Sequence, residues 1–135
     1  MFKVWIVFAA LGGALWASAA TAVGQEEAPA VPSGLHVTLI EQFVEPQPDG
    51  SLWARFRFVA PELSPSLGFD RVEQDFPYLC SAFALPRLAA SGNTVQQVVI
   101  SISQAALDFG ATDPDVTQYF EAFRVENDLC IWEGF

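Results

Sequence analysis

Two cysteines, Cys80 and Cys130, constrain the fold of this 135-residue chain more than any other feature. They follow an N-terminal segment typical of exported proteins, and disulfides form and persist in oxidising compartments outside the cytoplasm. We therefore predict one structural disulfide, which closes a loop of about fifty residues and stabilises the domain by roughly 4 kcal/mol. A redox pair is the alternative, but redox thiols usually stand as Cys-x-x-Cys beside a helix start. The bridge is expected to join a helical region to the last strand.

The N-terminal segment predicts export. Lys3 precedes an uncharged run over residues 4–16, and small residues follow at two Ala-x-Ala sites. This arrangement is typical of a secretory signal peptide, so we predict a signal over residues 1–22, cleaved after Ala19 or Ala22. The mature protein is then periplasmic or secreted.

An uncleaved anchor is the alternative, because the apolar run over residues 4–23 is near the length that spans a bilayer. No other stretch is long enough to cross a membrane as a helix. Residues 23–34 contain Pro29 and Pro32 and are interpreted as a flexible tether. Residues 35–135 then form a single domain of about 100 residues, large enough to bury a core of its own.

Charge narrows the range of partners. The chain has six basic and sixteen acidic residues, which gives a net charge of −10, and its only lysine lies in the predicted signal. Lys and Arg supply most of the affinity for phosphates, so we predict no nucleic acid partner and no anionic membrane surface. Three interpretations of the negative charge remain: a basic protein partner, a bound metal cation, or a contribution to solubility alone. Hydrophobic residues make up 52% of the chain, including 12 Phe and 4 Trp, so it is too apolar to be disordered.

Alternation of apolar and polar residues predicts strands. Residues 35–44 and 51–59 flank a turn-forming stretch and predict a β-hairpin. Residues 94–103 alternate most regularly and predict a further strand. Asn127 and Asp128 form a compact turn between two short extended runs, which predicts a closing hairpin.

One face of the second strand is unusual. Trp53, Arg55 and Arg57 point to one side of the strand, and the alternate residues are apolar. We expect the arginine face to point outward. Glu41 and Glu45 share a face of the preceding strand and are placed to pair with the arginines across the hairpin.

Two helices are expected between these strands. The apolar spacing over residues 71–84 predicts a helix that is kinked or broken at Pro77 and ends at Pro86. Asp113 followed by Pro114 is typical of a helix start, and the apolar residues that follow predict a second helix. The expected fold is α+β: an antiparallel sheet of four or five strands, two helices on one face and one disulfide.

The residue types present disfavour enzymatic activity. His36 is the only histidine, so most catalytic triads and histidine-based zinc sites are excluded, and we interpret it as a surface residue. No nucleophile elbow, phosphate-binding loop or metalloprotease motif occurs, and no cofactor is expected. Asp108, Asp113 and Asp115 could converge on calcium, but Pro114 breaks the EF-hand order, and helix capping explains them better.

The tail Phe-Glu-Ala-Phe-Arg (120–124) and Cys-Ile-Trp-Glu-Gly-Phe (130–135) follows the segments 101–103 and 108–110. In these residues the chain resembles a family of short exported proteobacterial proteins that carry a domain of unknown function. The resemblance covers roughly residues 35–135. It implies a small exported domain with a cysteine near its end, and no activity, ligand or catalytic residue.

The sequence is compatible with three functions. The leading hypothesis is a non-enzymatic accessory or inhibitor protein that binds another envelope protein through Trp53, Arg55 and Arg57. A basic envelope protein is one such partner. Trp and Arg are enriched at interface hot spots, although an ordinary solvated strand face is the alternative interpretation of these residues. The second hypothesis is a small-ligand or calcium-binding module that uses the loop from Asp108 to Asp115. The third is a carboxylate-dependent hydrolase, which rests on the number of acidic residues alone.

Overall fold

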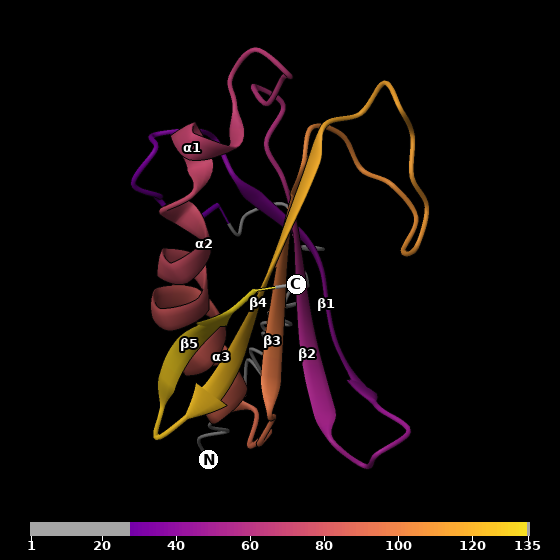
Figure 1. Ribbon diagram of the computed structural model, residues 1–135. Helices are drawn as coiled ribbons and strands as arrows, with labels where there is room; N and C mark the ends of the chain where they lie inside the picture. The colour runs from indigo at the N-terminus through magenta and orange to yellow at the C-terminus, as the bar shows by residue number, and fades with distance from the viewer. Residues whose placement is uncertain (1–27, 135) are drawn as a thin grey trace, which may run out of the picture.

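The computed structural model describes residues 28–134, so the predicted signal peptide lies outside the described residues (Figure 1). A single sheet and one helical segment build the fold, and the helical segment lies against one face of the sheet (Figure 1). The strands are β1 (Thr38–Pro46), β2 (Leu52–Val59), β3 (Gln97–Ser103), β4 (Gln118–Glu126) and β5 (Leu129–Glu133). The predicted α+β class is confirmed.

The sheet is mixed, and its strands lie side by side in chain order from β1 to β5. The β1–β2, β3–β4 and β4–β5 pairs are antiparallel, whereas β2 and β3 are parallel. The prediction of a purely antiparallel sheet is therefore wrong. The helical segment follows β2 and returns the chain to the end of the sheet at which β2 began, so the next strand runs parallel to it.

The helical segment covers residues 69–90 and is built from α1 (Phe69–Val72), α2 (Asp75–Tyr78), the π-helical η1 (Leu79–Ala84) and α3 (Leu85–Ala90). It continues past Pro86, where the sequence predicted its end. In η1 the Leu85 N–H donates to the Cys80 carbonyl, five residues earlier. This wider turn accommodates the Pro86 ring, and Pro86 itself stands in the first turn of α3, where no N–H donor is needed.

The second predicted helix is wrong. Residues 113–117 form a turn, in which the Asp113 carboxylate accepts the Asp115 N–H at 2.9 Å, and residues 118–126 form β4. A carboxylate that bonds the backbone two residues on closes a turn as readily as it caps a helix. The residues that follow have the types of an amphipathic helix, and their pairing with β3 from Gln118 to Arg124 makes them a strand instead.

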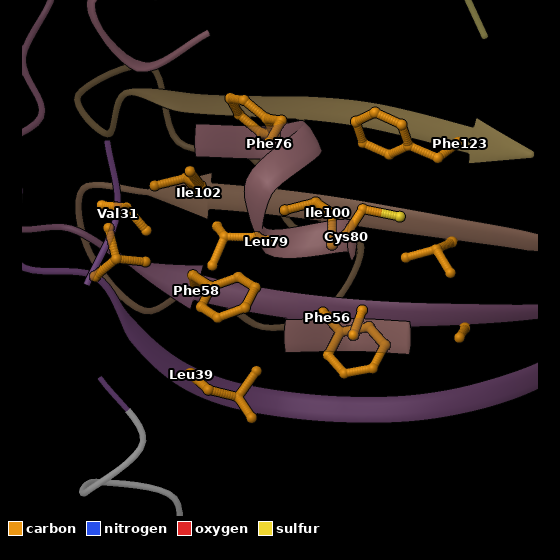
Figure 2. Close-up of a cluster of buried hydrophobic side chains, with 14 of the residues drawn as sticks. Val31, Leu39, Phe56, Phe58, Phe76, Leu79, Cys80, Ile100, Ile102 and Phe123 are labelled. Atoms are coloured by element: carbon orange, nitrogen blue, oxygen red, sulfur yellow. The ribbon is translucent and has the colours of Figure 1, made fainter. Parts of the chain in front are cut away.

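The core lies between the helical segment and the sheet (Figure 2). Phe56 and Phe58 of β2, Ile100 of β3 and Phe76 of α2 are fully buried there. The predicted disulfide is confirmed: Cys80 in η1 is bonded to Cys130 in β5, with their Cα atoms 6.2 Å apart. It joins the helical segment to the last strand, as expected.

The chain before β1 is packed onto the helical segment. Val31, within the predicted tether, is 8% exposed and belongs to the core. The Ser33 N–H donates to Asp75 Oδ1 at 2.8 Å, the Ser33 hydroxyl donates to Oδ2, and Arg71 Nη2 donates to the Ser33 carbonyl at 3.1 Å. Asp75 is only 1% exposed, so these bonds satisfy a buried carboxylate.

Both predicted hairpins are present. β1 and β2 pair through eight residues each, with one irregularity between Leu39 and Glu41. β4 and β5 are joined by Asn127 and Asp128, whose φ angles of 52° and 59° fit a tight two-residue turn. Asn and Asp tolerate this left-handed conformation better than most residues, which explains their position here.

Candidate functional site

In the part of the chain that the structure describes, the sheet face opposite the helical segment is covered only by the loop between β3 and β4. Residues 104–117, between β3 and β4, lie on the far side of the sheet from the helices (Figure 1). The Phe109 ring packs edge-on against Phe43 of β1, with ring centroids 5.0 Å apart. Arg57 of β2 donates to the Leu107 carbonyl and so holds the base of the loop.

A groove, here called the open-face groove, lies between this loop and the sheet. Its volume is about 240 Å³, and it shares Arg55, Val99, Gln118 and Phe120 with an adjoining hollow of about 460 Å³ beside Trp53. The groove is lined by Arg55, Arg57, Val99, Ser101, Phe109, Gly110, Ala111, Thr112, Gln118 and Phe120. Phe109 and Phe120 are 50% and 47% exposed, so two large rings border it with half of their surface open.

The arginines of the groove are paired within the sheet. Arg55 Nε donates to Glu45 Oε1 at 2.6 Å, and Arg57 Nη1 donates to Glu41 Oε2. The predicted cross-strand pairs are thus confirmed, and the register places Glu41 directly opposite Arg57. The expected outward arginine face is only partly correct, because Arg57 is 7% exposed beneath the loop.

Aromatic rings hold Arg55 in place. Its guanidinium carbon lies 5.1 Å from the Phe109 ring centroid and 5.7 Å from the Trp53 ring centroid. Arg57 approaches the same Phe109 ring at 5.8 Å. Such cation–π contacts stabilise a guanidinium that is partly removed from water.

The open-face groove unites two sets of residues that the sequence suggested separately. Arg55 and Arg57 of β2 supply its floor, Trp53 lines the adjoining hollow, and the loop that contains Asp108 supplies the roof through Phe109. Sequence reasoning missed the roles of Phe109 and Phe120. Phe120 is one of the apolar residues after Asp113 that predict a helix, and its alternation with Ala122 along an extended run is the signal that could have placed it on this face.

Comparison with known proteins places the chain in a family. Residues 10–135 match DUF6497, a family of unknown function. The chain belongs to this family. The predicted resemblance to a domain of unknown function is therefore confirmed. No curated protein and no solved structure matches this DUF6497 chain.

The three aspartates of the predicted calcium site are exposed in this DUF6497 fold. Asp113 accepts the Asp115 N–H, and Asp108 stands before Phe109 at the groove. Over residues 28–134, no group of three or more His, Cys, Asp or Glu side chains gathers in a way that could hold a metal ion. The geometry observed for Asp113 is that of a turn cap.

His36 has a partner that the sequence did not reveal. Its Nδ1 lies 2.5 Å from Glu62 Oε1, and the Glu62 carboxylate also accepts the His36 backbone N–H at 3.2 Å. The side-chain bond from His36 lowers the pKa of Glu62. The His36 side chain is 89% exposed, and neither residue lines the open-face groove. In the described part of the chain, no helix is long and apolar enough to span a bilayer.

Proposed function

We propose that this DUF6497 protein is an exported, non-enzymatic binding protein whose open-face groove takes apolar side chains from another envelope protein. The observation that carries the proposal is the combination of half-exposed aromatic rings and internally paired charges on one sheet face. Phe109 and Phe120 are the exposed rings, and the pairs Arg55–Glu45 and Arg57–Glu41 neutralise the groove.

The two rings give the groove an attraction for apolar groups. Each retains about half of its surface in water, and covering that surface contributes roughly 1 kcal/mol per ring. Trp53 continues the apolar surface into the adjoining hollow. Aromatic residues beside arginine are typical of the few interface positions that dominate binding energy.

Charge pairing decides the class of occupant. A charged segment gains little in the groove because each arginine already has a carboxylate partner. Apolar side chains of an extended partner segment gain most, since they displace water from the rings without breaking an ion pair. Binding at this site is therefore expected to be nearly independent of salt concentration.

Two observations support the other parts of the proposal. The disulfide between Cys80 and Cys130 fits an oxidising compartment, in agreement with the signal peptide predicted over residues 1–22. Among the described residues, those that line the open-face groove include no histidine, cysteine, aspartate or glutamate. General acid–base catalysis mostly draws on histidine and carboxylates, and a hydroxyl such as that of Ser101 or Thr112 needs such a base beside it to act as a nucleophile.

Site-specific photocrosslinking tests the proposal. A photoreactive phenylalanine analogue is placed at Phe120 and, as a matched control, at Tyr78, an aromatic residue of α2 that is 42% exposed. In intact envelopes, the Phe120 position is expected to give one discrete adduct at low and high salt, and Phe109→Ala is expected to reduce its yield. An equal adduct from Tyr78, or loss of the adduct at high salt, would contradict the proposal.

A small apolar ligand is the second candidate for the same groove. Ser101, Thr112 and Gln118 supply polar groups within a volume of about 240 Å³, and small-ligand sites typically combine an apolar lining with a few polar groups. Native mass spectrometry of the purified protein would detect a bound small molecule as added mass. If the ligand lies in the groove, the added mass should be absent from the Phe120→Thr variant. Added mass that persists in the variant would exclude the groove as the binding site.

A further inference from the structure

A second pocket lies on the other side of the sheet, where α1 and α2 meet β4 and β5; we call it the seam pocket. Its volume is about 240 Å³. Its walls include four aromatic rings, those of Phe69, Phe76, Phe123 and Trp132, and two carboxylates, Glu73 and Glu121. Figure 2 shows Phe76 on the helical segment beside Phe123 on β4. From this arrangement we propose that the seam pocket binds the cationic side chain, arginine or lysine, of a partner protein.

The rings would receive the apolar part of such a side chain. Trp132 is 63% exposed and stands at the edge of the sheet, whereas Phe76 and Phe123 are buried and form the floor. A cation over an aromatic face is attracted by the ring, and the methylene groups of arginine or lysine pack well on apolar walls. The Trp132 indole N–H donates to Glu121 Oε2, which fixes a ring and a carboxylate next to each other.

Within residues 28–134, no basic side chain neutralises the two carboxylates of the seam pocket. Glu73 makes no ion pair over residues 28–134, and the partner of Glu121 is the neutral Trp132 indole. Every arginine in the described part of the chain is engaged elsewhere: Arg55 with Glu45, Arg57 with Glu41, Arg71 with the Ser33 carbonyl, Arg87 with Gln42, and Arg124 with Glu126 and Glu133. None of these arginines lines the seam pocket.

Charge complementarity therefore selects the occupant. An anion would be repelled by Glu73 and Glu121, and a purely apolar side chain would remove these carboxylates from water without a partner. A guanidinium or ammonium group satisfies both carboxylates and stacks on the rings. The net charge of −10 attracts a basic partner over longer distances as well.

The position of β5 gives the partner a path to the pocket. β5 is the last strand of the sheet and pairs only with β4 among the described strands. An extended segment can add to such an edge by main-chain hydrogen bonds and direct every second side chain to one face. A basic residue at one of these positions would reach the seam pocket beside Trp132. This site lies on the helix-covered side of the sheet, so it is independent of the open-face groove.

The test is a titration with N-acetyl-arginine amide, followed through the indole N–H signals of Trp132 and Trp53 in a heteronuclear NMR spectrum. The matched ligand is N-acetyl-citrulline amide, which has nearly the shape of arginine but no charge. The Trp132 signal is expected to move saturably with the arginine compound and weakly with citrulline, and the Trp53 signal is expected to stay in place.

Variants locate the binding to the pocket. Glu121→Gln and Glu73→Gln are each expected to weaken arginine binding about tenfold, because a charge-assisted contact is lost. Glu126→Gln has the same change in net charge but lies in β4 on the opposite sheet face, so it is expected to bind as the wild type does. Equal shifts with citrulline, equal weakening by all three variants, or no movement of the Trp132 signal would overturn the proposal.

Discussion

The two faces of the sheet are built from the same strands but have opposite properties. On the helix-covered face, Phe56 of β2 and Ile100 of β3 are fully buried. On the open face, their neighbours Arg55 and Ser101 line a groove beneath a loop. Because successive residues of a strand point to opposite faces, one alternating sequence supplies both a dry core and a groove of aromatic rings and paired charges. The comparison indicates that the dry core is concentrated on one face, whereas the other face keeps an open groove between the sheet and a loop.

Removal of a core ring should have the largest effect. Phe56→Ala leaves a cavity in the middle of the helix-covered face and is expected to lower the free energy of unfolding by about 3–5 kcal/mol. Chemical denaturation with the disulfide intact measures this value. If Phe120→Thr, on the open face, lowers the free energy of unfolding as much as Phe56→Ala does, the difference between the two faces is contradicted.

Loss of the disulfide should come next. The double variant Cys80→Ala, Cys130→Ala is expected to lose about 2–4 kcal/mol, because the unfolded chain regains the freedom of a loop of about fifty residues. Thermal unfolding of the variant and of the oxidised wild-type protein measures the difference. A loss below about 1 kcal/mol would show that the bridge adds little to the contacts between η1 and β5.

The buried carboxylate of Asp75 binds the chain before β1 to the helical segment. Asp75→Ala removes the acceptor of two Ser33 hydrogen bonds and is expected to cost about 1–3 kcal/mol. The exposed Asp70 of α1 supplies the control, since Asp70→Ala is expected to change stability by less than about 0.5 kcal/mol. Chemical denaturation of both variants measures the costs, and equal costs would contradict the role assigned to Asp75.

On the open face, the loop over residues 104–117 depends on Arg57. Arg57→Met removes the bonds to Glu41 and to the Leu107 carbonyl, so the loop should open before the rest of the fold does. We expect a loss of about 1–2 kcal/mol and faster amide exchange that is confined to the loop. Arg124→Met breaks exposed pairs with Glu126 and Glu133 and serves as the control, with an expected effect below about 0.5 kcal/mol.

The smallest expected effect belongs to the exposed pair of His36 and Glu62. The hydrogen bond from His36 lowers the pKa of Glu62 below its ordinary value of 4.5. Because this pKa is lower in the folded state, the pair stabilises the protein above pH 4.5, and the contribution disappears as the pH falls through the folded pKa. Glu62→Gln should therefore be slightly less stable than the wild type at neutral pH and equally stable in strong acid. Melting temperatures measured over a series of pH values test this expectation. A Glu62→Gln variant that is more stable than the wild type at neutral pH would contradict it.

Local patterns predicted much of the fold. The alternation around Val98 and Ile100 identified β3, and the turn residues Asn127 and Asp128 identified the closing hairpin. The disulfide was predicted from the expected compartment, and the cross-strand ion pairs from shared strand faces. The strand, the turn and the ion pairs depend on contacts between near neighbours, and the disulfide pairing follows from the presence of two cysteines. A single sequence contains this information.

Long-range placement could not be predicted in the same way. The turn at Asp113 and the strand that follows have the residue types of a capped helix, and only pairing with β3 decides between the two structures. The direction of β3 relative to β2 depends on the path of residues 69–90. The position of Phe109 over Arg55 and Arg57 depends on a loop that folds back across the sheet, for which the sequence has no periodic signal.

The division between the two faces is tested most directly by Phe120→Thr, examined for both stability and binding. Threonine keeps the preference for a strand, and Phe120 is 47% exposed, so the free energy of unfolding should fall by about 1 kcal/mol or less. With the photoreactive residue moved to Trp53, the adduct with the partner should be lost in the same variant. A fall in stability as large as that of Phe56→Ala, or an adduct that persists, would contradict the account.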